Sequence, residues 1–371
     1  MNPTKYTSDK RTVLTLDAGG TNFIFSAMRG NEEIVSPIRK NAHSDDLEQC
    51  LETIIKGFEE VQEVLEEKAV AISFAFPGPA DYKNGIIGDL PNFTAFTGGI
   101  PMGPILEDRF DIPVFINNDG NLFAFGEALT GYLPWLNKQL KEAGSTKQYQ
   151  NLIGFTLGTG FGSGIVMNEI MMLGHSTGGA EIHNTLNAFH PEWNAEESVS
   201  TRAIQRVYAE QAGTSFDASL MPRDIYEIAK TGGEGVKDAA LESFRTYGLS
   251  LGNSIANTMS LFDGIVVLGG GVTAAWDLFA PAMFKEIGRN YMDFKGNLNS
   301  RLSYRVYNLE DETLFSEFAG KKAKELIIPG SGRRVMYDAF PRTGVGLSRM
   351  GASRAIATGA YAYAIQQLDV S

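Results

Sequence analysis

Two glycine-rich turns, each lying between two runs of strand-forming residues, constrain this chain more than any other feature. The first turn follows the apolar run that begins at Thr12, and the second follows the run that begins at Leu152. Successive backbone N–H groups that no side chain shields form a concavity that accepts phosphate oxygens. The candidate phosphate-binding residues of the two turns are Asp17, Gly19, Gly20, Thr21, Asn22, Gly158, Thr159, Gly160 and Gly162. Two such turns indicate a duplicated fold that closes on a polyphosphate from both sides; the alternative is two structural turns without a ligand.

The residues after the glycines exclude two better-known phosphate sites. A Walker loop requires Lys-Ser or Lys-Thr followed by a helix, and neither turn supplies the lysine. A dinucleotide fingerprint requires a helix directly after its glycines. Here residues 22–28 alternate and then reach a hairpin turn at Gly30-Asn31, before residues 33–38. The sequence therefore predicts a meander of strands after the first turn.

The size and charge of the chain restrict its class. At 371 residues it exceeds the usual size of one hydrophobic core, so we expect two domains. A composition of 43% hydrophobic and 20% charged residues is typical of a globular protein. The net charge of −12 argues against a nucleic-acid partner, whose binding surface would be basic.

Cysteine usage and the lengths of the apolar runs bear on the compartment. Cys50 is the single cysteine, which excludes an intrachain disulfide and a cysteine-rich zinc site. Residues 1–11 are polar and contain no apolar signal-peptide core, and no apolar run reaches membrane-spanning length. We therefore expect a cytoplasmic protein without a membrane partner.

Periodicity divides the chain into elements. Asp45 and Glu48 are expected to begin a helix whose apolar positions repeat as far as Leu65. Residues 134–151 are polar and predict a linker or surface insertion near the domain boundary. Residues 295–342 are polar and irregular and receive no assignment. Strands are expected at 69–76, 113–116 and 264–268, and helices at 121–129, 199–212, 223–230, 236–262, from about 274, and at 351–368.

A candidate catalytic carboxylate lies where a strand meets a helix, at Asn118-Asp119. The positive end of the helix dipole favours an ionised carboxylate there, and the end of a strand fixes its position. Phosphoryl transfer requires positioning, charge neutralisation and one such proton acceptor for the attacking alcohol. The simpler role for Asp119 is that of an N-cap.

Several polar residues at chain turns are suited to a polyhydroxy substrate, because carboxylates and amides bind hydroxyls that both donate and accept. Asn92, Glu181 and Glu196 are the candidates, with an ordinary loop role as the alternative for each. The three histidines of this region, His175, His183 and His190, fit no standard zinc spacing.

Two further positions suggest nucleotide chemistry. Residues Gly269, Gly270 and Gly271 lie between an expected strand and an expected helix, where adenosine could approach the backbone; the alternative is a helix start without a ligand. Asp17 could hold Mg²⁺ through water, because Mg²⁺ keeps several waters and takes few protein carboxylates; its alternative role is an Asx-turn.

These motifs in this order resemble the ROK family of sugar kinases and repressors, over about residues 13–368. The turn ending at Thr21 is similar to the family's first phosphate motif, and that beginning at Gly158 to its second. The resemblance also covers the segments Phe76-Pro77-Gly78-Pro79 and Leu90-Pro91-Asn92-Phe93, the segment Pro113 to Asn121, and the three glycines Gly269, Gly270 and Gly271. It implies that Asp119 is the catalytic base and that Asn92 touches sugar.

The resemblance implies an α/β chain with the two-lobed actin-like, ribonuclease-H-like ATPase fold and a cleft between the lobes. The predicted domains are a small N-terminal α/β lobe, 1–132, and a large C-terminal α/β lobe, 133–350. The C-terminal helix, about 351–371, is expected to pack back on the first lobe. Homodimers are common in the family, so the resemblance also implies a homodimer.

The chain departs from the family pattern at two points. Where the family has Gly-Glu-x-Gly-His, Glu181 matches the glutamate, but Asn184 stands in the place of the histidine and His183 lies one position early. The cysteines of the family's zinc knuckle are absent, so we expect no structural zinc. Glu196 matches the family's second sugar-binding glutamate, with Glu197 as the alternative.

The combined prediction is an ATP- and Mg²⁺-dependent sugar kinase of the glucokinase-like branch, with the 6-hydroxyl of glucose or a related aldose as acceptor. Asp119 would deprotonate that hydroxyl, and Asn92, Asn118, Glu181, Asn184 and Glu196 would contact the sugar. The alternatives are a kinase for fructose or an N-acetylated hexosamine, and a non-catalytic sugar-binding regulator. Only about ten residues precede the first strand, too few for the helix-turn-helix domain of the family's repressors. A third alternative, an actin-like or chaperone-type ATPase, would not need the sugar-binding residues.

Overall fold

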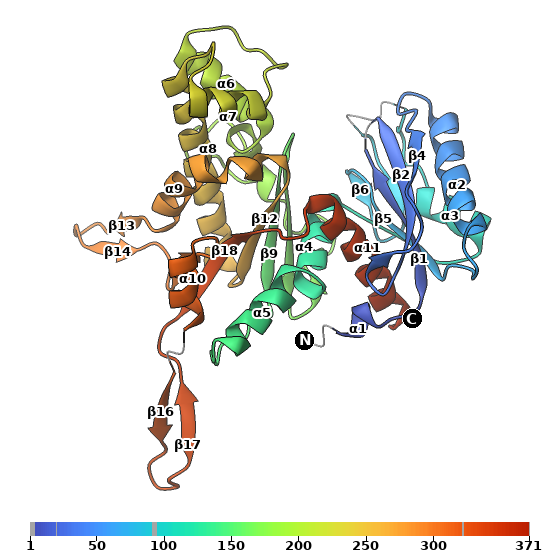
Figure 1. Cartoon of the computed structure of the whole chain (residues 1–371). Helices are drawn as coiled ribbons and strands as arrows, with labels where there is room; N and C mark the ends of the chain where they lie inside the picture. Colours follow the sequence, from blue (N-terminus) through green and yellow to red (C-terminus); the bar gives the residue numbers. More distant parts are fainter. Residues whose placement is uncertain (1–3, 20, 91–94, 321–322, 371) are drawn as a thin grey trace. The chain divides into compact units, whose positions relative to one another are not determined.

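The computed structural model describes residues 4–19, 21–90, 95–320 and 323–370. They form two compact units, and each unit is discontinuous in sequence (Figure 1). The first unit consists of Met1–Pro134, Ser163–Ala180 and Ser348–Ser371, and the second consists of Trp135–Gly162 and Glu181–Leu347.

A mixed sheet forms the centre of the first unit. Its strands are β1 (Thr12–Ala18), β2 (Asn22–Arg29), β3 (Glu32–Glu33), β4 (Ile38–Asn41), β5 (Ala71–Ala75) and β8 (Val114–Asn117). The order is β3-β2-β1-β5-β8, with β4 also paired to β2. Strands β1, β5 and β8 are parallel, whereas β2 is antiparallel to β1, so the predicted meander after the first glycine turn is confirmed.

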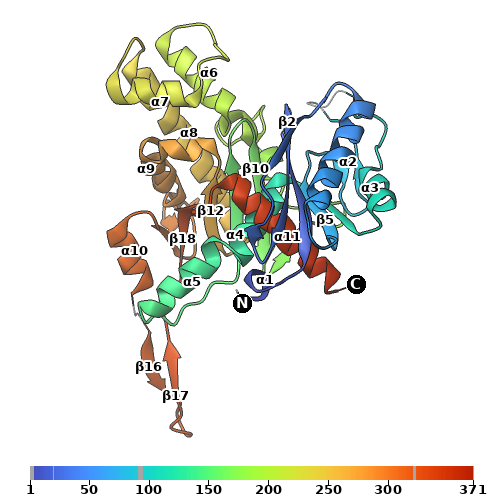
Figure 2. The same ribbon diagram turned by 45° about the vertical axis from the view of Figure 1, so that its right-hand side comes forward.

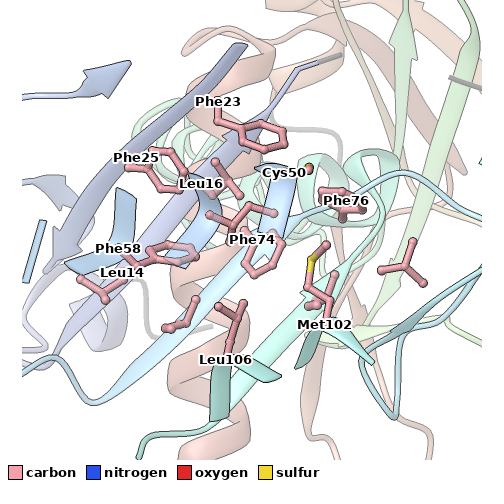
Figure 3. Packing of buried hydrophobic residues seen from close by; sticks show 14 of the residues in the cluster. Leu14, Leu16, Phe23, Phe25, Cys50, Phe58, Phe74, Phe76, Met102 and Leu106 are labelled. Atoms are coloured by element: carbon pink, nitrogen blue, oxygen red, sulfur yellow. The ribbon is translucent and has the colours of Figure 1, made fainter. Parts of the chain in front are cut away.

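The helices α2 (Leu47–Glu63) and α3 (Met102–Phe110) enclose an apolar core against this sheet (Figure 3). Phe58 of α2 lies edge-on to Phe25 of β2, with ring centroids 5.2 Å apart. The predicted start of α2 at Asp45 is wrong by one residue. Asp46 is the N-cap, and its carboxylate accepts a hydrogen bond from the backbone N–H of Gln49 at 3.0 Å.

Two helices of the first unit, α4 (Asp119–Leu129) and α11 (Ala352–Leu368), cross at backbone contact. A Cβ atom at Gly126 would overlap the carbonyl oxygen of Ala355, and one at Gly359 would overlap that of Leu122. Glycine is therefore required on both helices, because only its missing side chain permits this approach. The remaining elements here are α1 (Thr4–Thr7), β6 (Ala80–Asp81), β7 (Ile86–Ile87) and β11 (Ile170–Met171).

The second unit has a parallel sheet with the strand order β9-β12-β18-β15. These strands are β9 (Leu152–Leu157), β12 (Ile265–Gly269), β15 (Arg305–Asn308) and β18 (Arg342–Leu347). Every residue of β12 is buried, as expected for a strand covered on both faces. The chain leaves this unit within β10 (Phe161–Met167).

The other elements of the second unit bear out most of the predicted helices. Its helices are α6 (Thr201–Ala212), α7 (Pro222–Thr231), α8 (Lys237–Leu261), α9 (Trp276–Ile287) and α10 (Glu312–Ala319), with short 3-10 turns at Ile182–Asn184, Ala195–Ser198 and Gly271–Ala275. Two-stranded ribbons are formed by β13 (Asn290–Met292) with β14 (Leu298–Ser300), and by β16 (Lys324–Ile327) with β17 (Arg334–Tyr337). The region 295–342, left unassigned from sequence, thus contains regular structure.

The predicted linker at 134–151 is wrong in its first half, because α5 spans Tyr132–Glu142. The side chains of Leu133, Leu136 and Leu140 are fully buried at helical spacing, although the stretch as a whole is polar. Overall polarity therefore concealed an amphipathic helix. Among the residues that the structure describes, no helix has both the length and the hydropathy needed to cross a membrane.

Candidate active site

The first glycine turn joins β1 to β2 in a hairpin. The backbone N–H of Gly19 donates to the carbonyl oxygen of Asn22 at 3.1 Å. A Cβ atom at Gly19 would lie only 2.9 Å from that oxygen, which explains the glycine. The carbonyl oxygen of Thr21 accepts from the backbone N–H of Ala42 at 3.0 Å. The turn is therefore held by backbone hydrogen bonds, and the Thr21 side chain remains exposed.

Asp119 is the first residue of α4, and its side chain is exposed. The N-cap is Asn118, whose side-chain oxygen accepts from the backbone N–H of Asn121 at 2.7 Å. The capping role considered for Asp119 is therefore filled by its neighbour. One Asp119 carboxylate oxygen accepts from the backbone N–H of Gly120 at 2.8 Å, so the carboxylate stays at the positive end of the helix.

Strand register places Asp17 and Asp119 at the same edge of the first sheet. Asp17 is opposite Ala75 of β5, and Ala75 is opposite Asn117 of β8. Asp17 and Asn117 therefore lie two strand spacings apart, a distance of about 10 Å. Asp17 is an exposed residue near the end of β1, but the surrounding residues desolvate its carboxyl group enough to raise its pKa above the usual value. A nearby cation would offset that cost, and a carboxylate with water and phosphate oxygens is a donor set that Mg²⁺ accepts. The residues present thus fit the expected cation.

In the second unit, two glycine segments lie side by side at the carboxyl ends of parallel strands. Gly269 of β12 is opposite Thr156 of β9, so Gly158 and Gly270 follow neighbouring strand ends. Gly270 has a φ of +95°, and a Cβ atom there would overlap the carbonyl oxygen of Leu157. By contrast, no atom would lie within 4 Å of a Cβ at Gly158 or Gly271. This open space beside bare backbone suits phosphate or a flat base.

Glu196 connects the second glycine turn to the expected sugar residues. One of its carboxylate oxygens accepts from the backbone N–H of Phe161 at 2.9 Å. The other accepts from the Arg202 guanidinium at 2.9 Å. Arg202 also pairs with Glu197 at 2.6 Å. The carbonyl oxygen of Gly158 accepts from both the backbone N–H and the hydroxyl of Thr201, at 2.8 and 3.0 Å. Side chains therefore fix this turn.

Glu181 forms a pair with His183 at 3.0 Å between a carboxylate oxygen and Nδ1. The hydrogen bond to Glu181 raises the pKa of the His183 imidazole above its usual value, and the charge of Glu196 adds to this effect. Asn184, the residue after His183, ends the same 3-10 turn and is exposed. The histidine that lies one position early relative to the family pattern thus contacts the predicted sugar-binding glutamate.

The loop between Glu181 and Glu196 is closed by the buried side chain of Asn187. Its amide nitrogen donates to the Asn194 carbonyl at 3.1 Å and to the Ser198 hydroxyl at 2.8 Å. Its amide oxygen accepts from the backbone N–H groups of Phe189 and His190, both at 3.1 Å. This amide uses its two donors and two acceptor positions, so it fixes the loop. Among the described residues, no group of three or more His, Cys, Asp or Glu side chains is arranged to hold a metal ion.

The predicted residues thus fall into two groups. The first unit brings Asp17, Gly19, Thr21 and Asn22 to the same sheet edge as Asn118 and Asp119. The second unit contains the others that the structure describes, Gly158, Thr159, Gly160, Gly162, Glu181, Asn184, Glu196, Gly269, Gly270 and Gly271. Gly20 and Asn92 lie outside the described residues.

Sequence reasoning missed two residues that contact the candidate site, Thr201 and Arg202. Both follow Ser200 at the start of α6, immediately after the turn that contains Glu196. The available signal was the position of a hydroxyl and a cation, those of Thr201 and Arg202, at the start of a helix directly after the candidate carboxylate Glu196. From the sequence alone, neither residue is assigned a role.

Comparisons with known proteins agree on one family. A family model described as the ROK family matches residues 13–307. The crystal structure of a glucokinase from Parabacteroides distasonis is 48% identical, with a TM-score of 0.89, covering 98% of this chain and 99% of that one. The glucokinase of Thermotoga maritima is 25% identical over 307 residues, 77% of this chain and 90% of its own length. An N-acetyl-D-glucosamine kinase of Vibrio cholerae is 28% identical over 294 residues, 74% and 89% of the two lengths.

These similarities confirm the predicted fold class and the predicted family resemblance. The α/β chain with an actin-like ATPase fold, inferred from the motifs, agrees with the Parabacteroides structure over nearly the whole length of both chains. The family match covers both glycine turns, Asp119, Glu181 and Glu196.

Proposed function

We propose that this chain, which belongs to the ROK family, is a carbohydrate kinase that transfers the γ-phosphoryl group of ATP to a hexose hydroxyl, with the 6-hydroxyl of glucose favoured. Carbohydrate kinase activity is supported by the similarity to two glucokinases, one of them 48% identical. The observation that carries the residue assignment is the position of Asp119. It is a carboxylate at a strand–helix junction whose capping role is taken by Asn118.

The proposed reaction needs one proton acceptor. The sugar hydroxyl oxygen attacks the γ-phosphorus, the bond from that phosphorus to the bridging oxygen of ADP breaks, and the hydroxyl proton passes to the Asp119 carboxylate. Free backbone N–H groups of the two glycine turns would bind phosphate oxygens, and the second turn has open space for them, because no atom lies within 4 Å of a Cβ at Gly158. Asp17 would hold Mg²⁺ through water, and the ion would neutralise phosphate charge.

Sugar recognition is assigned to carboxylates and amides on short turns. Glu181 and Glu196 are fixed by His183 and Arg202, so their oxygens are oriented before a sugar binds. Asn118, Asn184 and Asn92 would complete the contacts. We place the reaction in the cytoplasm, where ATP is available.

The test replaces Asp119 by Ala and by Asn and measures ADP release over glucose, fructose, mannose and N-acetylglucosamine. Loss of a general base lowers kcat by roughly 100- to 10,000-fold, while sugar binding measured by calorimetry should remain close to that of the unaltered protein. Asp111→Asn, at the exposed end of α3, is the matched control and should keep full turnover. Retained turnover in the Asp119 variants would refute the assignment.

The same panel separates the alternatives. Preference for N-acetylglucosamine would favour the second candidate, which the 28% identity to the Vibrio kinase supports. Fructose as the best acceptor would assign a fructokinase. Binding of a sugar without ADP release for any acceptor would favour a sugar-sensing regulator.

A further inference from the structure

One residue of α4, Glu127, is a buried carboxylate that the proposed reaction does not use. Its side chain is fully buried, about two turns of the helix beyond Asp119. Burial raises the pKa of its carboxyl group above the usual value, and hydrogen bonds from Ser348 and from the Tyr132 backbone oppose that rise. A buried carboxylate is costly unless it is hydrogen-bonded, so its partners indicate its role.

Both oxygens of the Glu127 carboxylate accept hydrogen bonds. One accepts from the backbone N–H of Tyr132 at 2.8 Å, and the other accepts from the hydroxyl of Ser348. That hydroxyl also accepts from the backbone N–H of Gly351 at 3.0 Å, where α11 begins. Glu127 therefore ties the end of α4 to the start of α11. These two helices lie side by side in both views (Figures 1 and 2).

Both partners of Glu127 lie at places where the chain passes from one unit to the other. These passages, which we call connections, follow Pro134, Gly162, Ala180 and Leu347. Tyr132 lies two residues before the first connection, and Ser348 is the first residue after the last. Glu127 therefore joins the first and last connections on the side of the first unit.

The other two connections are joined at the opposite end of α4. The hydroxyl of Ser163, which follows the second connection, donates to the carbonyl oxygen of Ala180, which precedes the third. The backbone of Ser163 also lies against the first turn of α4, since a Cβ atom at Gly120 would overlap the Ser163 carbonyl. Gly120 is next to Asp119. One pair of connections therefore lies beside the candidate base, and the other pair lies beside Glu127.

A second carboxylate holds the last connection on the side of the second unit. Glu310, between β15 and α10, accepts from the backbone N–H of Leu347 at 2.9 Å. Glu310 and Leu347 belong to the second unit, whereas Glu127 and Ser348 belong to the first. Separate carboxylates thus hold two successive residues of the chain, one in each unit. Only the torsions of Leu347 and Ser348 lie between the held groups.

We propose that Glu127 is a positioning residue for phosphoryl transfer, because it holds one end of an axis along α4 about which the two units turn. Two joined pairs of connections define a line, and turning about that line leaves the hydrogen bonds of both pairs intact. A few residues at the ends of elements then absorb the motion. Asp119 lies at one end of the line, so it keeps its place while groups further from α4 move. The proposal rests on the proposed function, in which closure over the substrates excludes water.

The first experiment measures the freedom of the units without turnover. Spin labels on Lys68→Cys in the first unit and Ser215→Cys in the second report their separation by pulsed electron paramagnetic resonance. Both positions are exposed, whereas Cys50 is buried. In the absence of any ligand, Glu127→Ala should broaden the distribution of label distances, because the connections at one end of α4 are released.

The conservative variant Glu127→Gln should keep the width of the unaltered protein. Its amide oxygen can accept from the Tyr132 N–H, and its amide nitrogen can donate to the Ser348 hydroxyl, which accepts as well as donates. The variant therefore removes the charge and keeps both hydrogen bonds.

Two smaller changes guard against misfolding of Glu127→Ala. Ser348→Ala removes one hydroxyl, and Glu310→Ala removes the half-buried carboxylate on the other side of the last connection. Each should broaden the distance distribution in the same way. Glu312→Ala, which removes an exposed carboxylate two residues beyond Glu310, is the matched control and should leave the distribution unchanged.

Turnover separates a positioning role from a merely structural one. In Glu127→Ala, kcat should fall by roughly 10- to 100-fold because reacting groups are misplaced, while the dissociation constants for ATP and sugar, measured by calorimetry, should stay close to those of the unaltered protein. Glu127→Gln should restore kcat. Adding Ser348→Ala to Glu127→Ala should cause no further loss, because the two groups form one network.

The proposal and the proposed function fail separately. Absence of ADP release by the unaltered protein with every sugar would refute the kinase assignment, and the label distances, which need no substrate, would still decide the role of Glu127. Equal distributions in the unaltered protein, Glu127→Ala and Ser348→Ala would overturn that role. So would a broadened Glu312→Ala distribution, or a loss of kcat that Glu127→Gln does not restore.

Discussion

The glycine turns of the two units have similar sequences but are fixed in different ways. The turn at Gly19 is closed by hydrogen bonds of its own backbone and of a neighbouring strand. The turn at Gly158 also has a backbone hydrogen bond of its own, from the N–H of Gly158 to the carbonyl oxygen of Gly160 at 3.2 Å. In addition it contacts side chains from other segments, namely Thr201 of α6 and Glu196. The difference shows that a phosphate-binding turn can be shaped locally, by a hairpin, or from outside, by residues that also belong to the substrate site.

This second arrangement has a functional consequence. Glu196 contacts the backbone N–H of Phe161, directly after the glycine turn, and is itself a proposed sugar ligand. A change at the sugar carboxylate should therefore also disturb the phosphate turn. No such coupling is expected at the first turn.

The largest effect is expected from Glu196→Ala. It removes a charged acceptor from the Phe161 N–H, and losing a hydrogen bond to a charged group costs about 1.5–3 kcal/mol. The value of kcat/KM for sugar should fall by roughly 10- to 150-fold, and the KM for ATP should rise as well. Steady-state kinetics measure both.

Glu197→Ala is the matched control, because Glu197 pairs with the same Arg202 and, among the residues that the structure describes, its carboxylate accepts no hydrogen bond from the turn. It should leave the KM for ATP nearly unchanged. Equal changes in the two variants would contradict the coupling.

A stability effect comes next, at the glycine segment after β12. Gly270→Ala introduces a Cβ that overlaps the Leu157 carbonyl, at a residue with positive φ. The free energy of unfolding in urea should fall by about 2 kcal/mol or more. Gly271→Ala, where the added Cβ meets open space, should change it by less than about 0.5 kcal/mol. Similar losses in both variants would disprove the steric argument.

A direct comparison of the two turns uses Gly158→Ala and Gly19→Ala. At Gly158 the new methyl group contacts no protein atom and occupies the space proposed for phosphate. Stability should therefore be unchanged while the KM for ATP rises by about tenfold, or 1.4 kcal/mol. At Gly19 the methyl group lies 2.9 Å from the Asn22 carbonyl, so stability should fall by about 1 kcal/mol. Thermal unfolding and ATP kinetics on both variants distinguish the two effects.

The smallest effect concerns His183 and pH. Its pKa is raised by the hydrogen bond to Glu181, so the protonated form stabilises the fold, fully below the unfolded pKa of about 6.5. That contribution is lost as pH rises through the raised folded value. The pair is about one-third exposed, so His183→Gln should cost less than about 1 kcal/mol. In urea unfolding, the loss of unfolding free energy in His183→Gln should be measurable at pH 5.5 and absent at pH 9. A loss of the same size at both pH values would contradict this prediction.

The sequence was informative wherever a local pattern determines structure. Alternating residues after Gly19, the helices beginning near Thr201, Pro222 and Lys237, and the strand before Gly270 were predicted because periodicity and glycine act over a few residues. The amphipathic helix α5 was missed because polar side chains outnumber the buried leucines on its other face. Residues 324–337, which form the ribbon of β16 and β17, received no assignment because the surrounding segment is polar and irregular in sequence.

The candidate site could be predicted only in part for a related reason. Asp119 and Glu196 stand next to recognisable signals, a strand–helix junction and a helix start. The roles of Arg202, Thr201 and Asn187 depend on contacts across the fold, such as the two donor and two acceptor bonds of the Asn187 amide. The place of Thr201 and Arg202 beside Glu196 was a signal for those two residues, but the contacts they make could not be read from the sequence.

The close crossing of α4 and α11 has a consequence for biosynthesis. During translation the N-terminal strands leave the ribosome first, and domains generally fold in that order. The first unit, however, needs α11, whose residues 352–368 are made after nearly all of the second unit. Until then the Gly126 face of α4 has no helix against it. The first unit can therefore complete its fold only after α11 has been synthesised. Until then, ribosome-bound intermediates should expose the Gly126 face of α4 to chaperones.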